Sequence, residues 1–246
     1  MRIKALLLAA GLGTRLRPLT LKTPKCLVEI DGIPLLGLWL KKLNNLGCDE
    51  VLINTHYLNE QVESYLSKER FKNMKIKISY EEKLLGTAGT LIHNSQFFND
   101  GIGLLIHADN YTNDNLSEFV KCHLSKPKDC VLTMLTFKTD NPSSCGIVEK
   151  DNLGRIINFY EKSKEYRGDC ANGALYAFNE DFISYLKKMP HKPFDFSNDV
   201  IPNLLNKIFS YHTSNTYFDI GNYAAYCKAN EIAKKIKNSS FIAKFE

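Results

Sequence analysis

Short runs of consecutive apolar residues, rich in Val, Ile and Leu, alternate along the first half of the chain with segments of helical periodicity. Such unbroken runs are typical of parallel strands covered by helices on both faces, because neither face then needs polar residues. The expected strands are residues 3–10, 50–57, 75–80, 103–109 and 130–137. The β-α-β-α-β order predicts an α/β fold with a mainly parallel sheet.

The pattern changes after about residue 138. Residues 145–150 and 155–162 resemble two strands joined by a tight turn at 151–154, which predicts an antiparallel insertion. A further strand is expected at 171–178. Helices are expected near 180–188 and 198–205, and a closing helix near 222–236, where apolar residues form one stripe.

Composition limits the partners. The net charge of +5 is spread along 246 residues, which suits a small anionic ligand better than nucleic acid. The seven cysteines form no Cys-x-x-Cys pair, so we expect reduced thiols and a cytoplasmic protein. The apolar run at residues 3–10 is too short for a signal peptide, and no stretch approaches the roughly 20 residues that cross a bilayer. We therefore expect no membrane partner.

A glycine-rich segment with two arginines, residues 11–18, directly follows the first expected strand. Its main-chain N–H groups should lie at the carboxyl edge of the sheet, where open α/β sheets bind ligands. Glycines allow close approach to phosphate oxygens, and Arg15 and Arg17 can add charge-assisted hydrogen bonds. Leu16 stands where a dinucleotide fingerprint needs glycine, and residues 16–18 lack the Gly-Lys-Ser/Thr of a P-loop. Taken alone, the segment fits a polyphosphate site and a simple glycine turn equally well.

The longer string LAAGLGTRLRPLT at residues 8–20, followed by TPKCL at 23–27, strongly resembles the signature of the sugar-1-phosphate nucleotidylyltransferases. The similarity continues through most of the chain. It implies one domain, residues 1–246, in which a Rossmann-like nucleotide-binding half (1–110) merges with a sugar-phosphate-binding half (111–246). It also implies an enzyme of nucleotide-sugar biosynthesis, for instance for surface polysaccharide.

The resemblance also assigns residues to the nucleotide. Arg15 would hold the β- and γ-phosphates, and Lys25 the α-phosphate. The nucleotide-binding residues that it implies are Leu8, Ala10, Gly11, Gly13, Thr14, Arg15, Lys25, Glu81, Gly86, Thr87, Ala88 and Gly89.

Two aspartates are candidates for a metal site. Asp109 ends an apolar strand, which puts a carboxylate at the sheet edge, and Mg²⁺ prefers oxygen ligands. Asp219 lies in an apolar context before the last helix. As isolated features both are more often caps or surface residues. The resemblance implies that they are the two magnesium-binding aspartates, although Ala108 replaces the usual glycine before the first.

Residues 80–89 resemble the base-recognition segment of the family, with Glu81 at the position of its base-reading side chain. A carboxylate only accepts hydrogen bonds, so it pairs best with two adjacent donors, as on guanine. This favours GTP. Leu84 departs from the proline that is frequent in guanylyltransferases, and a plain polar turn before a helix near Thr87 is the alternative.

The antiparallel insertion carries the positions that the resemblance assigns to the sugar phosphate. Glu161 would accept from sugar hydroxyls, Lys162 would neutralise the 1-phosphate, and Asn172 and the Gly146 amide would fix the ring. Asp109 would also face this substrate. Cys145 stands in place of the commoner tyrosine. Without the resemblance, Glu161 and Lys162 would be an ordinary exposed strand end.

The expected reaction is in-line attack of a 1-phosphate oxygen on the α-phosphorus, with pyrophosphate leaving. Charge neutralisation and alignment should dominate, with Arg15, Lys25, Asp109, Lys162 and Asp219 as the catalytic set. GTP with a mannose- or heptose-type sugar is favoured. A cytidylyl- or uridylyltransferase is the first alternative, acting on choline phosphate, a phosphonate or an amino sugar. For choline phosphate, Tyr160, Tyr166 and Tyr176 would form an aromatic cage.

A noncatalytic regulator that binds a nucleotide sugar is the second alternative, ranked last because Arg15, Lys25 and Asp219 all stand. The chain ends soon after its final helix, so we expect no β-helix domain of the kind that some relatives append. The oligomeric state, monomer or homodimer, stays open.

Overall fold

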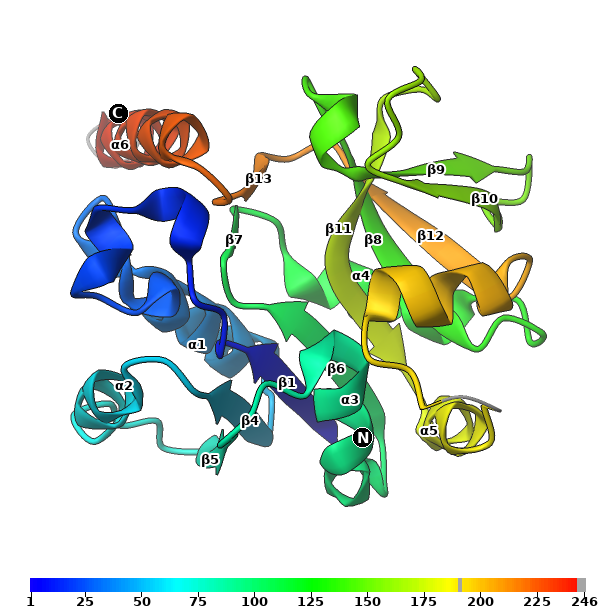
Figure 1. The fold of residues 1–246 in the computed structure, drawn as a ribbon, viewed down its shortest axis with the longest axis horizontal. Coiled ribbons are helices and arrows are strands. Elements are labelled where there is room, and N and C mark those ends of the chain that lie inside the picture. The colour runs from blue at the N-terminus through cyan, green and yellow to red at the C-terminus, as the bar shows by residue number, and fades with distance from the viewer. Residues whose placement is uncertain (190–191, 243–246) are drawn as a thin grey trace.

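The computed structural model describes residues 1–189 and 192–242, without the side chains of 237–242. A nine-stranded mixed sheet forms its centre, with strand order β10-β9-β11-β6-β1-β4-β5, and β8 and β12 continue from β11 (Figure 1). The strands are β1 (Ile3–Leu8), β4 (Glu50–Thr55), β5 (Lys75–Tyr80), β6 (Ile102–His107), β8 (Leu132–Lys138), β9 (Gly146–Lys150), β10 (Ile156–Glu161), β11 (Cys170–Phe178) and β12 (Ile208–Thr213). The α/β fold with a mixed, mainly parallel central sheet is confirmed.

Two halves of this sheet differ in direction. The strands β5, β4, β1 and β6 are all parallel, in the register Lys4↔Glu50, Lys4↔Gly103 and Glu50↔Lys75. Beyond β6 the direction reverses, because β11 runs antiparallel to β6, β8 and β9. The predicted hairpin is present as β9 and β10, which pair antiparallel. The antiparallel insertion is therefore part of the same sheet.

Helices cover both faces of the sheet, as the unbroken apolar strands predict. One face carries α1 (Leu35–Leu46), α2 (Asn59–Leu66) and α4 (Leu116–Ser125). The other carries α3 (Gly86–His93) and α5 (Glu180–Lys187). Side chains alternate between the two cores along each strand: in β1, Ala5 and Leu7 join the first core, whereas Leu6 joins the second.

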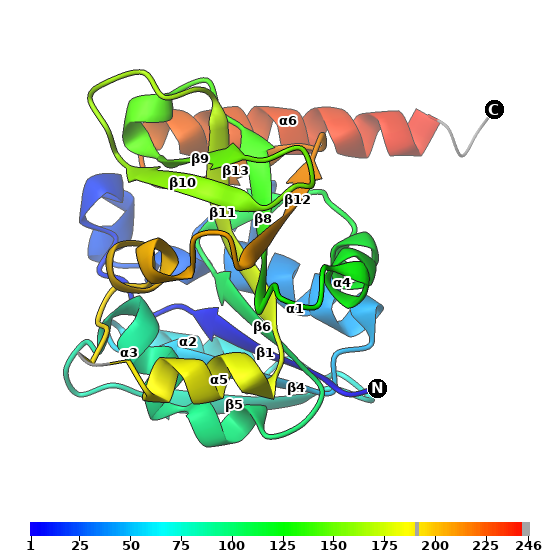
Figure 2. The ribbon, with the colours of Figure 1, turned by 90° about the vertical axis from the view of Figure 1, so that its right-hand side faces the viewer.

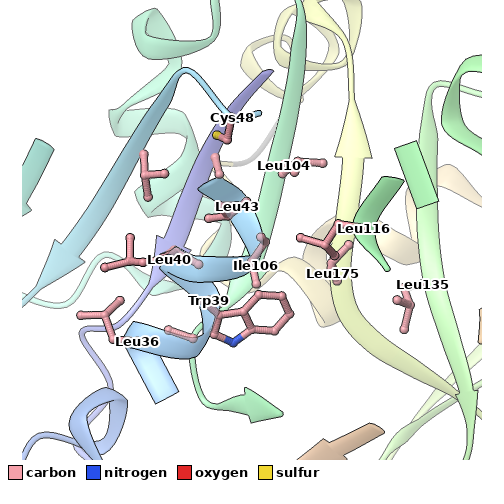
Figure 3. Close-up of a cluster of buried hydrophobic side chains, with 14 of the residues drawn as sticks. Leu36, Trp39, Leu40, Leu43, Cys48, Leu104, Ile106, Leu116, Leu135 and Leu175 are labelled. Carbon is pink, nitrogen blue, oxygen red and sulfur yellow. The ribbon is translucent and has the colours of Figure 1, made fainter. Parts of the chain in front are cut away.

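The first core packs α1 against the parallel strands. Trp39, fully within this core, donates from Nε1 to the carbonyl of Asn110 at 2.8 Å, so the largest side chain also fixes the chain after β6. Figure 3 shows Trp39, Leu40 and Leu43 of α1 facing Leu104 and Ile106 of β6. This packing anchors the strand whose end carries Asp109.

The closing helix α6 (Tyr223–Ile242) lies outside the sheet, along the side of the molecule that holds β13 (Figure 2). Its Ala229 is fully buried against Leu16, Leu35 and Ile220. A short antiparallel pair, β7 (Asn110–Thr112) with β13 (Tyr217–Asp219), lies beneath it. A second small pair, β2 (Glu29–Ile30) with β3 (Ile33–Pro34), precedes α1. No helix in the described ranges meets the length and hydropathy that a bilayer crossing requires.

Several expectations need correction. The strands β1, β4 and β6 end two residues before the predicted limits, because the chain leaves the sheet there and enters the loops at its carboxyl edge. Residues 198–205 do not form an α-helix. A short π-helix at Phe196–Val200 is followed directly by a 3₁₀ helix at Ile201–Leu204. Pro202 explains the change, since it has no N–H to donate within an α-helix.

Candidate active site

Two cavities open at the carboxyl edge of the parallel strands, of about 270 Å³ and about 210 Å³. Both cavities are lined by His107, the last residue of β6, and by Asp109, two residues further on. The cavities therefore meet at these two side chains. This is the sheet edge at which the sequence placed the site.

The first cavity is formed by the ends of β1 and β4 and by the start of α3. Of the residues predicted for the nucleotide, it is lined by Leu8, Ala10, Gly11, Lys25, Glu81, Gly86 and Thr87. Its lining also includes Leu84 of the predicted base-recognition segment and residues to which the sequence gave no role: Ala9, Cys26, Asn54, Thr90, His107 and Phe194. Gly13, Thr14, Ala88 and Gly89 are outside this lining as far as the described residues define it.

The glycine-rich loop leaves β1 and folds back on itself. Gly13 has φ +62°, and its carbonyl accepts from the hydroxyl of Thr20 at 2.6 Å. A side chain on Gly13 would meet Thr20 and the Cβ of Lys25. Glycine at this position therefore allows both the turn and the close approach of Lys25, which is 8% exposed.

The second cavity lies between β6 and the antiparallel insertion. All five residues predicted for the sugar phosphate line it: Asp109, Gly146, Glu161, Lys162 and Asn172. It also contains Arg15, Asp219 and the segment Asp195, Ser197 and Asn198. Arg15, expected at the β- and γ-phosphates, thus faces this cavity beside Asp219.

The two aspartates come together although 110 positions separate them. The β7–β13 pair aligns Asp219 with Asn110, and the Ile220 N–H donates to the Asp109 carbonyl at 3.1 Å. The Lys25 ammonium forms an ion pair with the Asp109 carboxylate. The strand ends thus bring two acids and one lysine to the junction of the cavities.

The electrostatics differ between the two acids. Burial opposes ionisation of Asp109, but the charges of Lys25 and His107 outweigh it and hold the pKa of Asp109 below its usual range. For Asp219, burial and then the negative charge of Asp109 raise the pKa, although Lys25 and Arg15 oppose the shift. Burial also lowers the pKa of His107, whose Nε2 is buried without a hydrogen-bond partner. Burial and the neighbouring carboxylate thus disfavour the ionised form of Asp219 when no cation lies between the two acids.

A divalent cation between the two carboxylates would offset this penalty. Carboxylate oxygens are the ligands that Mg²⁺ prefers, and it usually keeps waters and substrate phosphates as its remaining ligands. Within the described residues, no group of three or more His, Cys, Asp or Glu forms a metal cage. A pair of carboxylates beside phosphate-sized cavities therefore suits a cation that arrives with its nucleotide.

The Glu81 carboxylate, predicted to read the base, already accepts three hydrogen bonds within the protein. Its Oε1 accepts from Asn54 Nδ2 at 3.0 Å and from the Thr90 hydroxyl at 2.5 Å, and its Oε2 accepts from the Leu85 N–H at 3.0 Å. Nearby, the N–H groups of Ala88 and Gly89 donate to the Phe194 carbonyl, at 2.9 and 3.4 Å. The α3 amides expected at the base are therefore already paired.

Asn172 also has internal partners. Its Nδ2 donates to the Tyr176 hydroxyl at 2.7 Å, and its Oδ1 accepts from the Ala174 N–H at 2.9 Å. The register of β11 shifts here, and Ala174 takes φ +49°. This irregularity turns the strand toward the second cavity, as bulges at functional sites do.

The aromatic cage for a quaternary amine does not form among the described residues. Tyr176 is fully buried beneath Asn172, Tyr160 faces the Arg167 guanidinium at 4.9 Å, and Tyr166 is 77% exposed. These three rings are absent from the described lining of either cavity. The choline phosphate alternative loses the feature that motivated it.

Comparisons with known proteins agree with this geometry. The profile of the nucleotidyl transferase family matches residues 4–236, and the chain belongs to that family. It is 32% identical to a mannose-1-phosphate guanylyltransferase catalytic subunit beta of Drosophila melanogaster, over 89% of this chain and 59% of that protein. It is 30% identical to a UTP–glucose-1-phosphate uridylyltransferase of a Synechocystis species, over 96% of this chain and 65% of that protein.

The fold comparison gives the same class. The crystal structure of HddC from Yersinia pseudotuberculosis superposes with a TM-score of 0.78 at 24% identity, covering 94% of this chain and 99% of that one. This likeness establishes the α/β nucleotidyltransferase fold. The chain spans only about three fifths of the length of the curated relatives above, from 59% to 65%. Members of the family generally use a divalent metal ion.

Proposed function

We propose that this chain transfers a nucleoside monophosphate from a nucleoside triphosphate to a sugar 1-phosphate, giving a nucleotide sugar and pyrophosphate. The observation that carries the proposal is the meeting of two cavities at Asp109, with Lys25 bound to that carboxylate and Asp219 beside it. One cavity is lined by the glycine-rich loop, the other by Arg15, Glu161 and Lys162. A triphosphate and a phosphorylated sugar would then react where the cavities join.

In the proposed reaction, an oxygen of the sugar 1-phosphate attacks the α-phosphorus of the triphosphate. A new P–O bond forms, and the bond to the β-phosphate oxygen breaks as pyrophosphate leaves. Lys25 would neutralise the α-phosphate, and Lys162 the attacking phosphate, so that two polyanions can approach each other. No covalent intermediate with the protein is needed.

Asp109 and Asp219 would hold the metal ion, which we propose to be Mg²⁺. When bound, the ion would supply charge stabilisation to the phosphate oxygens. The chain itself contributes positioning: the main-chain bond from Ile220 to Asp109 holds the backbone of the two aspartates together at the end of the β7–β13 pair. Lys25 balances part of their charge in the absence of the ion.

We propose GTP and a mannose-type sugar 1-phosphate as first substrates to test, on the names of the guanylyltransferase relatives. We also propose a heptose-type sugar 1-phosphate, which the sequence resemblance favours together with mannose. The two-donor argument for guanine at Glu81 is weaker than the sequence suggested, because three donors already occupy that carboxylate. A uridylyltransferase relative keeps UTP in the comparison. The seven free cysteines support a cytosolic setting.

The test is a pyrophosphate-release screen that crosses GTP, UTP, CTP and ATP with a panel of hexose and heptose 1-phosphates in the presence of Mg²⁺. We expect at least one pair to release pyrophosphate only when both substrates are present. Asp219→Ala should abolish the release, and chelation of the metal should do the same. Pyrophosphate release without a sugar phosphate, or none with any pair, would reject the proposal.

A further inference from the structure

The buried surroundings of Glu81 hold a network that the transfer chemistry does not need. Glu81, Asn54 and Thr90 are 4%, 3% and 1% exposed, and all three line the first cavity. Asn54 is the second-to-last residue of β4, and Thr90 lies in α3. The network therefore joins a strand to a helix beside the first cavity. Buried polar groups of this kind rigidify a site when each is satisfied.

The orientation of the Asn54 amide follows from its first partner. The main-chain N–H of Ala9 can only donate, and it lies 2.7 Å from Asn54 Oδ1. The amide NH₂ must then face the other way, toward Glu81 Oε1 and the Thr90 hydroxyl. Asn54 therefore connects the end of β1, where the glycine-rich loop begins, to the Glu81 carboxylate.

Counting acceptor positions shows what remains open on Glu81. A carboxylate has about four lone-pair positions, two on each oxygen. Asn54 and Thr90 occupy both on Oε1, and the Leu85 N–H occupies one on Oε2. Among the residues that the structure describes, no donor takes the second acceptor position on Oε2, which is therefore left for a ligand.

A single acceptor divides the bases by chemistry. Guanine, uracil and thymine carry a ring N–H on their pairing edge, which can donate to Oε2. Adenine and cytosine have an unprotonated ring nitrogen at that position, which is an acceptor and would repel the carboxylate. Their exocyclic amino group could reach Oε2 only if the base shifted within the cavity. A polar site of this type discriminates strongly, because the wrong partner leaves buried groups unpaired.

We propose that Asn54 and Thr90 are positioning residues that hold Glu81 as a single acceptor for the ring N–H of a base, so that base selectivity depends on all three. The proposal rests on the proposed function in one respect: the first cavity receives the base of a nucleoside triphosphate. Without the two donors, Oε1 gains open acceptor positions and the carboxylate can rotate. Selectivity should then fall even though Glu81 is still present.

The test compares Thr90→Val, which removes the hydroxyl donor with little change in volume, with Thr90→Ser, which keeps it. Binding of GTP, UTP, ATP and CTP with Mg²⁺ is measured by calorimetry without a sugar phosphate. For the wild type we expect GTP or UTP to bind at least tenfold more tightly than ATP and CTP. Thr90→Val should reduce this ratio by about tenfold, the loss expected for one buried hydrogen bond, and Thr90→Ser should retain it.

Asn54→Asp provides a second measurement if Thr90→Val does not fold. It keeps an oxygen for the Ala9 N–H but turns a second oxygen toward Glu81, so it should also reduce the ratio. An equal loss of affinity for all four triphosphates in these variants would indicate a purely structural role and overturn the proposal. Equal binding of all four bases by the wild type would overturn it as well.

These binding ratios separate the proposal from the transfer reaction. A wild type that selects ring N–H bases but releases no pyrophosphate with any sugar phosphate would contradict the proposed function and leave the role of Asn54 and Thr90 supported. Pyrophosphate release without base selectivity would support the proposed function and contradict the role of Asn54 and Thr90.

Discussion

The parallel and antiparallel halves of the sheet contribute to the site in different ways. In the parallel half, β1, β4 and β6 end side by side, so residues that immediately follow them gather at one edge. In the antiparallel half, the side chains come from a hairpin end at Glu161 and a strand irregularity at Asn172. One half assembles its site through strand direction, the other through turns and a bulge.

The linings of the two cavities reflect this difference. The first cavity contains small and apolar side chains such as Leu8, Ala9 and Ala10, beside buried polar groups that are already paired. The second contains Arg15, Glu161, Lys162 and Asp195. We infer that the first cavity selects by fixed shape and a single acceptor, and the second by charge. The predictions below start at the junction and move outward.

The largest effect is expected at the junction, which both halves share. Lys25→Ala should reduce turnover by about a hundredfold to a thousandfold, because it removes a charge aimed at the transferred phosphate and leaves Asp109 without its partner. Steady-state kinetics on the substrate pair found in the screen gives the measurement. Lys121→Ala is the matched control, since this lysine is exposed on α4 and forms a surface ion pair with Glu118. Turnover of Lys25→Ala within a few fold of the wild type would exclude the lysine from the reaction.

The next effect concerns stability in the antiparallel half. His123 of α4 is fully buried, with its ring nitrogens 2.9 Å from the Thr133 hydroxyl and 3.1 Å from Asn179 Oδ1. Burial lowers the pKa of His123 to about 4, whereas in the unfolded chain it is near 6.5. On acidification the unfolded chain takes up the proton first, so stability is lost as the pH falls from 6.5 toward 4.

This group should contribute about 3 kcal/mol of the decrease in unfolding free energy between pH 6.5 and pH 4. Urea denaturation across that range measures it. His123→Gln should be less stable at pH 7 but should lack this part of the slope. An unchanged slope in the variant would assign the acid sensitivity to other groups.

The smallest effect is expected at the start of α3, where Gly86 packs against Phe194 beside the first cavity. Gly86 has φ +74°, and a Cβ there would meet the main-chain carbonyl oxygen of Phe194 and lie 2.8 Å from its ring. Gly86→Ala should therefore destabilise the fold by about 1–3 kcal/mol. Gly89→Ala is the control, because its nearest neighbour would be at 3.5 Å and alanine favours the helix. Thermal unfolding compares the two; equal melting temperatures would show that Phe194 moves aside freely.

Sequence reasoning located the elements with strong periodic signals. The parallel strands were predicted to within about two residues, because each is an apolar run that both cores require to be buried. The helix α4 and the strand β12 were missed. In β12 the residues Ser210, Tyr211 and His212 interrupt the apolar pattern, because the strand pairs with β8 at one end of the sheet and stays partly exposed. The short β7–β13 pair has no periodic signal at all.

The site residues also divide into those with a signal in the sequence and those without one. The glycine loop and Asp109 carry local signals in the sequence, whereas Lys25, Glu161 and Lys162 were assigned only through the family resemblance. Asn54, Thr90 and the segment that starts at Phe194 gave no signal, since a buried asparagine or threonine has a meaning only through its partners. The sequence alone, through its apolar pattern and the family resemblance, determined an α/β nucleotidyltransferase, and it predicted a phosphate-binding loop at the sheet edge. The resemblance also paired Asp219 with Asp109. Only the tertiary structure showed how the Ile220–Asp109 hydrogen bond holds these segments together and how Asn54 and Thr90 occupy Glu81, because both depend on hydrogen bonds between segments far apart in the chain.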